Sequence, residues 1–244
     1  MKKRKLCYLI LTSLLLAVIN NSSVSSLQIH TVDAQPMLAG SVPVVAEATS
    51  MTYTPDYPIH FIGDSRTVGM QQALTYHQYD LTNHSFTARI GKGYSWLSVQ
   101  RNLTELSPSI LIINLGVNDL GNIKQYQALY ETYAQTCWKD CPIYIVSVNP
   151  CCQPCTSVSN GQIEAFNASM EEWIEAYNEK NASTSTETFP IRYIDTYHFL
   201  LSEGYSSSDG LHYSAATYEH IYNYIIEHIE EPIGDGTGIY TVSS

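Results

Sequence analysis

The chain has 244 residues, of which 44% are hydrophobic and 14% charged. This is the composition of a globular protein, long enough for one α/β domain with a buried core but too short for two large domains. Its formal net charge of −11 repels nucleic-acid phosphates and anionic lipid headgroups, so no nucleic-acid partner is expected.

The N-terminus has the layout of a secretory signal. Lys2–Lys5 is basic, and Leu6–Ile19 is an apolar run followed by Ser and Asn residues. The run is shorter than the ~20 residues of a membrane-spanning helix, so export to a secreted or cell-surface location is expected, without stable membrane insertion. Cleavage after Ala34 removes four basic residues and Asp33, leaving 8 Lys and Arg against 22 Asp and Glu, a net charge of −14.

The remaining sequence divides into a linker, one domain and a tail. Residues 35–57 are rich in Pro, Ala, Val, Ser and Thr without a periodic pattern, which is typical of a linker. Residues 58–232 carry the periodic segments and form the expected folded domain. Residues 233–244 are rich in Gly, Thr and Ser and are expected to be a flexible tail.

Within the domain, short apolar runs alternate with segments of helical spacing. The helical spacing is clearest between Ile163 and Tyr177 and between Tyr218 and Ile229. Five repeats of strand and helix predict an α/β fold, a three-layer α/β/α sandwich with a five-stranded parallel sheet, whose functional site lies at the carboxyl ends of the strands. The predicted strands are Ile59–Ile62, Phe86–Ile90, Ile110–Leu115, Ile143–Val148 and Ile191–Ile194.

Five cysteines follow the predicted signal: Cys137, Cys141, Cys151, Cys152 and Cys155. Disulfides are expected in an exported protein, and an odd number leaves at least one thiol unpaired. No His is near and the spacing fits no zinc knuckle, so no metal site is expected. The predicted strand after Cys141 would hold it ~30 Å from Cys151, too far for a disulfide. We therefore expect local pairs: Cys137 with Cys141, and one pair among the other three.

Ser65 stands at a predicted turn from strand to helix. It ends the tripeptide Gly63-Asp64-Ser65, and Arg66 begins the expected helix. A hydroxyl at this turn is exposed at the sheet edge, where helix amides stabilise negative charge on an attacked carbonyl. The alternative is that Ser65 merely caps the helix.

Hydrogen-bond donors follow the second and third predicted strands. Gly91 and Gly93 follow the second, and Asn118 follows the third. The N–H groups of Gly91 and Ser65, with the side-chain amide of Asn118, predict an oxyanion hole, which needs neutral donors ~3 Å from the developing charge. The alternatives are that the glycines serve only a turn and that Asn118 is a helix cap or Asx turn.

Two Asp-x-x-His segments offer a base for Ser65. Imidazole accepts the serine proton, and a carboxylate on the other ring nitrogen fixes the tautomer. Asp209 and His212 lie in a Ser/Gly-rich loop before a helix that Ser214 is expected to cap, whereas Asp195 and His198 directly follow an apolar strand. We favour Asp209 and His212, because a structural hydrogen bond is the commoner role of an Asp at a strand end.

Four segments in this order resemble the sequence blocks of the SGNH (GDSL-like) hydrolase family: Gly63-Asp64-Ser65, Gly91, Gly116-x-Asn118-Asp119 and Asp209-x-x-His212. The resemblance extends from Ile59 to Ile229. It implies a flavodoxin-like sandwich, a catalytic triad of Ser65, His212 and Asp209, an oxyanion hole of Ser65, Gly91 and Asn118, and no cofactor. The chain departs from the common pattern at Arg66, where the family often has Leu, which suggests an altered substrate pocket. Gly93 is a second candidate for the role of Gly91.

The resemblance implies hydrolysis of acyl esters through an acyl-serine. With the predicted export and the 19 tyrosines, which can stack on sugars but are equally ordinary at half-buried positions, it suggests removal of O-acetyl groups from a carbohydrate. The expected partner is thus a small acyl ester or an acylated glycan. Two alternatives remain, namely an O-acyltransferase on the same scaffold and a non-catalytic carbohydrate-binding surface module. The sequence indicates nothing about oligomeric state.

Overall fold

A computed structural model describes residues 58–183 and 189–229. The predicted signal, linker and tail (1–34, 35–57 and 233–244) lie outside these ranges. Within them, no helix is both long enough and apolar enough to cross a membrane.

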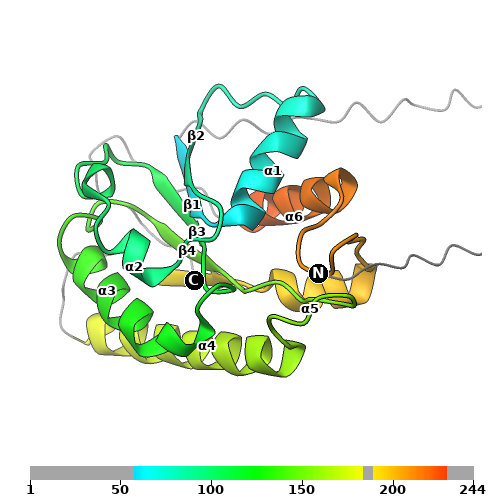
Figure 1. The fold of residues 1–244 in the computed structure, drawn as a ribbon. Helices are drawn as coiled ribbons and strands as arrows, with labels where there is room; N and C mark the ends of the chain where they lie inside the picture. Colours follow the sequence, from blue (N-terminus) through cyan, green and yellow to red (C-terminus); the bar gives the residue numbers. More distant parts are fainter. Residues whose placement is uncertain (1–57, 184–188, 230–244) are drawn as a thin grey trace, which may run out of the picture. The chain divides into compact units, whose positions relative to one another are not determined.

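The core of the domain is a five-stranded, all-parallel sheet with helices on both faces (Figure 1). The predicted three-layer α/β/α sandwich is therefore confirmed. The strand order is β2-β1-β3-β4-β5, so the chain reverses direction across the sheet between β1 and β3. The strands are β1 (Ile59–Gly63), β2 (His84–Ala88), β3 (Ile110–Asn114), β4 (Ile143–Val146) and β5 (Ile191–Ile194).

The second strand lies two residues earlier than predicted from its apolar residues. It pairs with β1 from Ile59 opposite His84 to Gly63 opposite Ala88, and the pairing stops where β1 stops. Ile90, which suggested a longer strand, is 70% exposed beyond the end. On an edge strand with half-buried residues, hydrophobicity alone marks the boundaries poorly.

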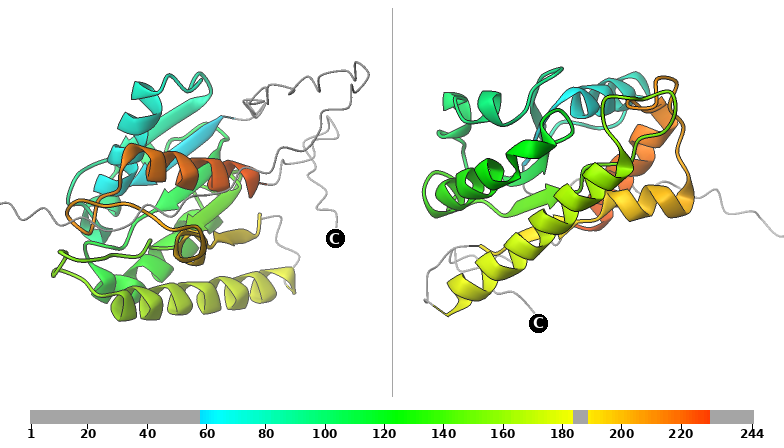
Figure 2. Two further views of the ribbon diagram at one scale, coloured as in Figure 1. Left: turned by 90° about the vertical axis from the view of Figure 1, so that its right-hand side faces the viewer. Right: turned by 60° about the horizontal axis from the view of Figure 1, so that its bottom comes forward.

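Side chains of the inner strands alternate between two hydrophobic cores. In β3, Leu111 and Ile113 enter one core with helices α3 (Ile123–Gln135) and α4 (Asn160–Ala182). Ile110 and Ile112 enter the other core with α1 (Ser65–Tyr76) and α6 (Ala215–Glu227). This is the period-two pattern of a strand buried on both faces. Figure 2 shows α4 and α6 on opposite sides of the sheet.

In the described ranges, six α-helices connect or flank the strands, and the two predicted from helical spacing are present. They are α1 (Ser65–Tyr76), α2 (Tyr94–Leu97), α3 (Ile123–Gln135), α4 (Asn160–Ala182), α5 (Thr196–Glu203) and α6 (Ala215–Glu227), with short 3-10 turns at Arg101–Leu103 and Leu120–Asn122. Ser214 caps α6 as expected, its hydroxyl accepting the N–H of Thr217.

Three asparagines of α4 bind backbone groups of neighbouring segments of the same chain. Asn160, Asn167 and Asn178 are 7 and 11 residues apart, a spacing that returns side chains to one face of a helix. Each amide accepts a backbone N–H and donates to the C=O of the same residue: Cys151, Val148 and Ile191, respectively, at 2.7–3.0 Å. These pairs fix the segments leaving β4 and entering β5.

The predicted disulfides are absent, because all five described cysteines are free thiols. The thiol of Cys151 donates instead to the carbonyl of Val158 at 3.3 Å, and Cys155 lies 4.0 Å from the same oxygen. Burial raises the pKa of both Cys141 and Cys151, which favours the protonated thiol.

Candidate active site

Ser65 is the first residue of α1 and lies at the carboxyl end of β1. Asp64 is the helix cap, because its side chain accepts the backbone N–H of Arg66 at 2.9 Å. The hydroxyl of Ser65 is therefore not needed for capping, which removes the capping interpretation. The residue is 8% exposed.

His212 connects Ser65 to Asp209. Its Nε2 lies 2.9 Å from the Ser65 Oγ, and its Nδ1 lies 2.6 Å from Asp209 Oδ2. The other Asp209 oxygen accepts the backbone N–H groups of Leu211 and His212 at 2.8 and 2.7 Å. An ionised Asp209 accepts a hydrogen bond from Nδ1–H, leaving Nε2 free to accept the hydroxyl proton of Ser65.

Asp209 is held in its ionised form. The hydrogen bond from the His212 side chain is the main cause, followed by the backbone N–H groups of the same loop, and together they keep the pKa of Asp209 far below its ordinary value. The carboxylate is therefore available to accept the hydrogen bond from His212 Nδ1–H.

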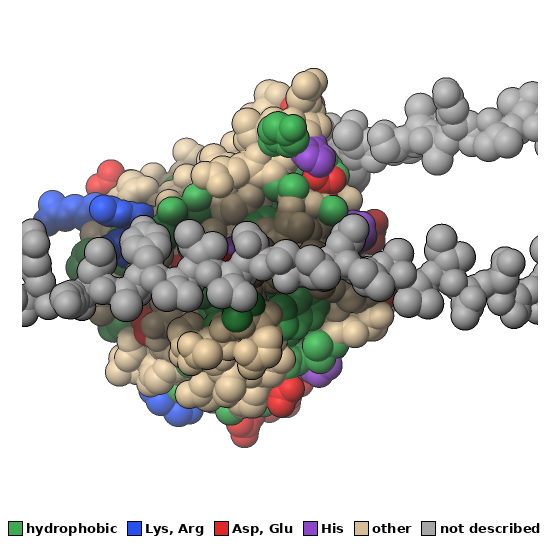
Figure 3. All heavy atoms as spheres, turned by 45° about the vertical axis from the view of Figure 1, so that its right-hand side comes forward, with side chains coloured by type: hydrophobic (Ala, Val, Ile, Leu, Met, Phe, Trp, Pro, Cys, Tyr) green, Lys and Arg blue, Asp and Glu red, His purple; other side chains and the backbone are tan. Residues whose placement is uncertain are grey.

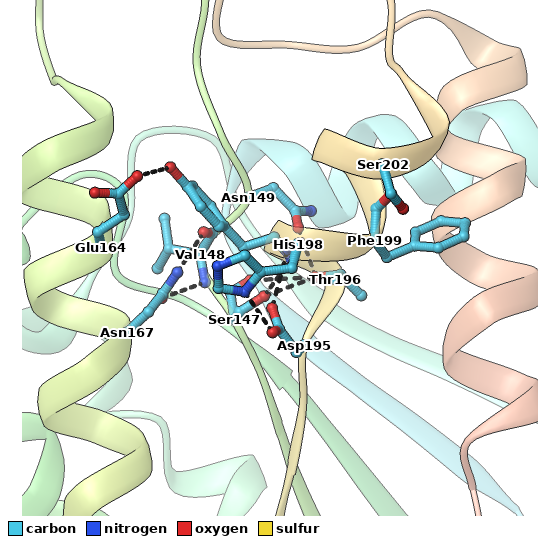
Figure 4. A network of polar contacts seen from close by, with 11 residues as sticks. Ser147, Val148, Asn149, Glu164, Asn167, Asp195, Thr196, His198, Phe199 and Ser202 are labelled. Atoms are coloured by element: carbon cyan, nitrogen blue, oxygen red, sulfur yellow. Dashed lines mark hydrogen bonds and ion pairs between the residues drawn. The ribbon is translucent and has the colours of Figure 1, made fainter.

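Asp195 and His198 form a second pair with the same internal geometry. His198 Nδ1 lies 2.6 Å from Asp195 Oδ2, and Asp195 also caps α5. The His198 side chain is 74% exposed, and among the described residues its Nε2 has no hydroxyl partner. Figure 4 shows the pair beside Ser147, a buried hydroxyl already bonded to Thr196 and to the N–H of Tyr197. Of these two histidines, only His212 contacts a serine hydroxyl.

The loop after β2 is fastened to the loop after β3. Asn118 Nδ2 donates to the carbonyl of Lys92 at 2.9 Å, and Asp119 accepts the N–H of Tyr94 at 2.8 Å. Gly93 lies between these bonds, so close to Asp119 that a Cβ on Gly93 would come within 2.3 Å of its carboxylate. One N–H of the Asn118 amide thus binds the loop after β2, and the second N–H remains available as a donor.

Gly91 and Gly93 differ in their surroundings. Gly91 is exposed, has a φ of +68°, and would have open space around a Cβ. Its conformation is that of a turn residue, which L side chains adopt at a cost. Gly93 has extended backbone and is the one held against residues 118 and 119. The predicted donors Gly91 and Asn118 do lie on adjoining loops, but Gly93 is the glycine fixed by contacts.

Sequence reasoning gave Asp119 no role, although it was part of a quoted motif. Its oxygens accept from Tyr94 N, from Asn122 Nδ2 at 3.0 Å and from the Tyr126 hydroxyl at 2.7 Å. These bonds tie both loops to α3. A half-buried acceptor with three donors is visible only once the loops are folded together.

Two further residues of the first motif are buried beneath the site. Asp64 is 1% exposed, and burial raises its pKa to about 6. Arg66 is 2% exposed and bonds to backbone carbonyls. The expectation that Arg66 alters the substrate pocket is therefore wrong, because its side chain is enclosed by protein. In the described ranges, no group of three or more His, Cys, Asp or Glu is arranged to hold a metal ion.

The sequence matches the profile of a known family, GDSL-like Lipase/Acylhydrolase, over residues 59–225. The chain belongs to this family. Among solved structures, an acetylxylan esterase from Geobacillus stearothermophilus is 13% identical, with 74% of this chain and 98% of that chain covered and a TM-score of 0.50. An α/β hydrolase from the metagenome of Lake Arreo is 11% identical, with 72% and 96% covered and a TM-score of 0.50. No curated protein matches the chain.

Membership of the GDSL family makes the protein a serine hydrolase. The two solved structures share the fold of this GDSL protein, and at such low identity the likeness shows the fold alone.

Proposed function

We propose that this GDSL protein hydrolyses acyl esters, with Ser65 as nucleophile, His212 as general base and Asp209 as the acid that orients it. The 2.9 Å contact between Ser65 Oγ and His212 Nε2 is the observation that supports this assignment most directly. The catalytic roles themselves are those of a Ser-His-Asp triad.

In the first half-reaction, His212 takes the hydroxyl proton as Ser65 Oγ attacks the ester carbonyl. The tetrahedral intermediate collapses to an acyl-serine, and the alcohol leaves with the proton returned by His212. In the second half-reaction His212 takes a proton from water, whose oxygen attacks the acyl-serine. The acid is then released and Ser65 recovers its proton.

The oxyanion of each intermediate needs neutral donors. We assign these to the N–H of Ser65 at the start of α1, the second N–H of the Asn118 amide, and a glycine N–H of the loop after β2. Gly91 was the predicted glycine. Gly93 is the better candidate, because its neighbours Lys92 and Tyr94 are bonded to Asn118 and Asp119.

The substrate class that we propose is an O-acetylated carbohydrate. Family chemistry supports an acyl ester, and the fold shared with an acetylxylan esterase is compatible with a short acyl group on a sugar. The net charge of −11 favours a neutral glycan over a polyanion. Figure 3 shows acidic side chains scattered over one face rather than gathered in a patch.

We also propose that the protein works outside the cytoplasm. The support is the basic and apolar layout of residues 2–19. Sequencing the N-terminus of protein recovered from the culture medium and from the cell surface tests it, since a start near residue 35 is expected and a start at Met1 in the cytoplasm contradicts it.

Ester specificity tests the proposed function. Purified protein is given 4-nitrophenyl acetate, butyrate and octanoate, and separately acetylated xylan, with Ser65→Ala as control. We expect the highest kcat/KM on acetate and release of acetate from the glycan. Preference for octanoate would overturn the acetyl assignment. Faster formation of acetylated sugar than of acetate would indicate the acyltransferase instead. The absence of any turnover would indicate a non-catalytic module.

A further inference from the structure

Arg66 is the only buried Lys or Arg in the described parts of the chain. A guanidinium removed from water is costly unless its N–H groups find acceptors. The residue immediately follows Ser65 in α1, so whatever holds its side chain also bears on the position of the nucleophile.

All three guanidinium nitrogens of Arg66 donate to backbone carbonyls. Nη1 donates to Asn149 at 2.7 Å and Nη2 to Pro150 at 3.2 Å, both in the segment after β4. Nε donates to Leu211 at 3.0 Å. One side chain on α1 is thereby bonded to two segments about 60 residues apart in the sequence, and the second contains His212.

The Tyr213 ring packs against the Arg66 guanidinium. The ring centroid lies 5.2 Å from Arg66 Cζ, within the range of a cation–π contact. The Tyr213 hydroxyl donates to the carbonyl of Pro150, which Arg66 also binds. His212 is therefore flanked by two residues, Leu211 and Tyr213, that both contact Arg66.

The geometry of these bonds ties the nucleophile to its base. Arg66 adjoins Ser65 in α1, while Leu211 adjoins His212 in its loop, and the Nε–carbonyl bond joins the two pairs. A planar guanidinium with five fixed donors holds such an arrangement, whereas the single ammonium of Lys cannot reach all three carbonyls from one position. The Arg66–Leu211 bond and the Ser65–His212 contact thus join the same two segments.

We propose that Arg66 is a positioning residue, which sets the distance between Ser65 Oγ and His212 Nε2 by anchoring the His212 loop to α1. The inference rests on the proposed roles of Ser65 and His212. It also accounts for Arg at a position where a GDSL protein often has Leu: the cation binds backbone carbonyls beneath the site and is not part of the substrate pocket.

Arg66→Lys and Arg66→Met test the proposal, with Asn160→Ala as the matched control. Asn160 holds Cys151, the next residue of the segment after β4, and in the described ranges it forms no hydrogen bond with the His212 loop. Melting temperature, kcat and KM on 4-nitrophenyl acetate, and the rate of Ser65 labelling by a fluorophosphonate are measured for each protein.

We expect kcat and the labelling rate to fall together, about 100-fold for Arg66→Met and less for Arg66→Lys, with KM changed little, since misplacement of about 1 Å costs a rate of that order. Asn160→Ala is expected to lower the melting temperature without a comparable loss of kcat. If Arg66→Met does not fold, Arg66→Lys alone decides.

The proposal is overturned if folded Arg66 variants keep kcat within threefold of wild type, or if Asn160→Ala loses as much kcat at an equal loss of melting temperature. Failure of the proposed function looks different, because wild-type protein itself would then not be labelled at Ser65.

Discussion

Two residue pairs with the same spacing and the same 2.6 Å hydrogen bond have different surroundings in this protein. The Nε2 of His212 meets Ser65, whereas the His198 side chain is exposed at the start of α5. The chemistry of an Asp-His pair therefore depends on what faces the far side of the ring, which spacing along the chain does not encode.

Substitution of the two aspartates separates their roles. Asp209→Ala is expected to lower kcat about 10³-fold or more, because His212 loses the partner that fixes its tautomer. Asp195→Ala should leave kcat within a factor of a few and cost only about 1 kcal/mol of stability through loss of the α5 cap. Steady-state kinetics on 4-nitrophenyl acetate measures both, and equal losses of kcat would contradict the assignment.

The buried Asp64 gives a prediction about pH. Its pKa in the folded protein is about 6, against an ordinary value of 3.8, so folding favours its protonated form. Stability from this group is greatest below pH 3.8 and is lost as the pH rises through 6. The difference in pKa corresponds to about 3 kcal/mol.

Asp64→Asn keeps a side-chain oxygen for the α1 cap and removes the buried charge. We expect the variant to be more stable than wild type by up to about 3 kcal/mol above pH 6 and to show no advantage below pH 4. Urea unfolding at pH 4 and pH 8 measures this, and an unchanged or lower stability at pH 8 would refute it.

At the scale of elements, the amides of α4 connect helix and sheet. Asn167 is buried, and both its oxygen and its nitrogen bond to Val148. Asn167→Ala leaves a buried N–H and a buried C=O without partners, which costs about 1–3 kcal/mol each. We expect a loss of a few kcal/mol by urea unfolding, and almost none for Glu172→Ala on the exposed face of the same helix.

The histidine between β1 and β2 predicts a second pH dependence of the unfolding free energy. His60 in β1 is buried, its ring bonded to Ser85 and Thr87 of β2, and burial lowers its pKa below 6.5. The unfolded chain therefore takes up a proton first as the pH falls below 6.5, and the stability contributed by a neutral His60 is lost toward acid.

His60→Gln is expected to weaken the pH dependence of the unfolding free energy. The difference in unfolding free energy between wild type and the variant should shrink as the pH is lowered from 7.5 toward 5. A difference that stays constant over this range would contradict a neutral buried His60.

Strands and helices were predictable where burial was complete. Ile110–Asn114 is buried at every residue and was found from its apolar run, as was the apolar face of α4. The edge strand β2 was misplaced because Ile90 is apolar yet exposed. The role of the α4 asparagines could not be predicted from the sequence. An asparagine that hydrogen-bonds to backbone groups of another segment has the same sequence pattern as any polar residue of a helix.

For the whole molecule, the order of strands and helices predicted that Ser65 and His212 meet. Ser65, Asn118 and His212 each follow a buried strand or precede a helix, and parallel strands bring such ends to one edge. Charges and contacts inside the fold were not predictable. Arg66 suggested a pocket residue, but it lies enclosed because three carbonyls from distant loops compensate its desolvation.

The account depends most on one contact, that of the Ser65 hydroxyl with the His212 imidazole. Mass spectrometry of wild type and His212→Ala, each treated with a fluorophosphonate and digested, examines it directly. We predict one adduct on the peptide containing Ser65 in the wild type and almost none in His212→Ala. An adduct on another serine, or equal labelling of Ser65 in both proteins, would contradict the proposed nucleophile and its base.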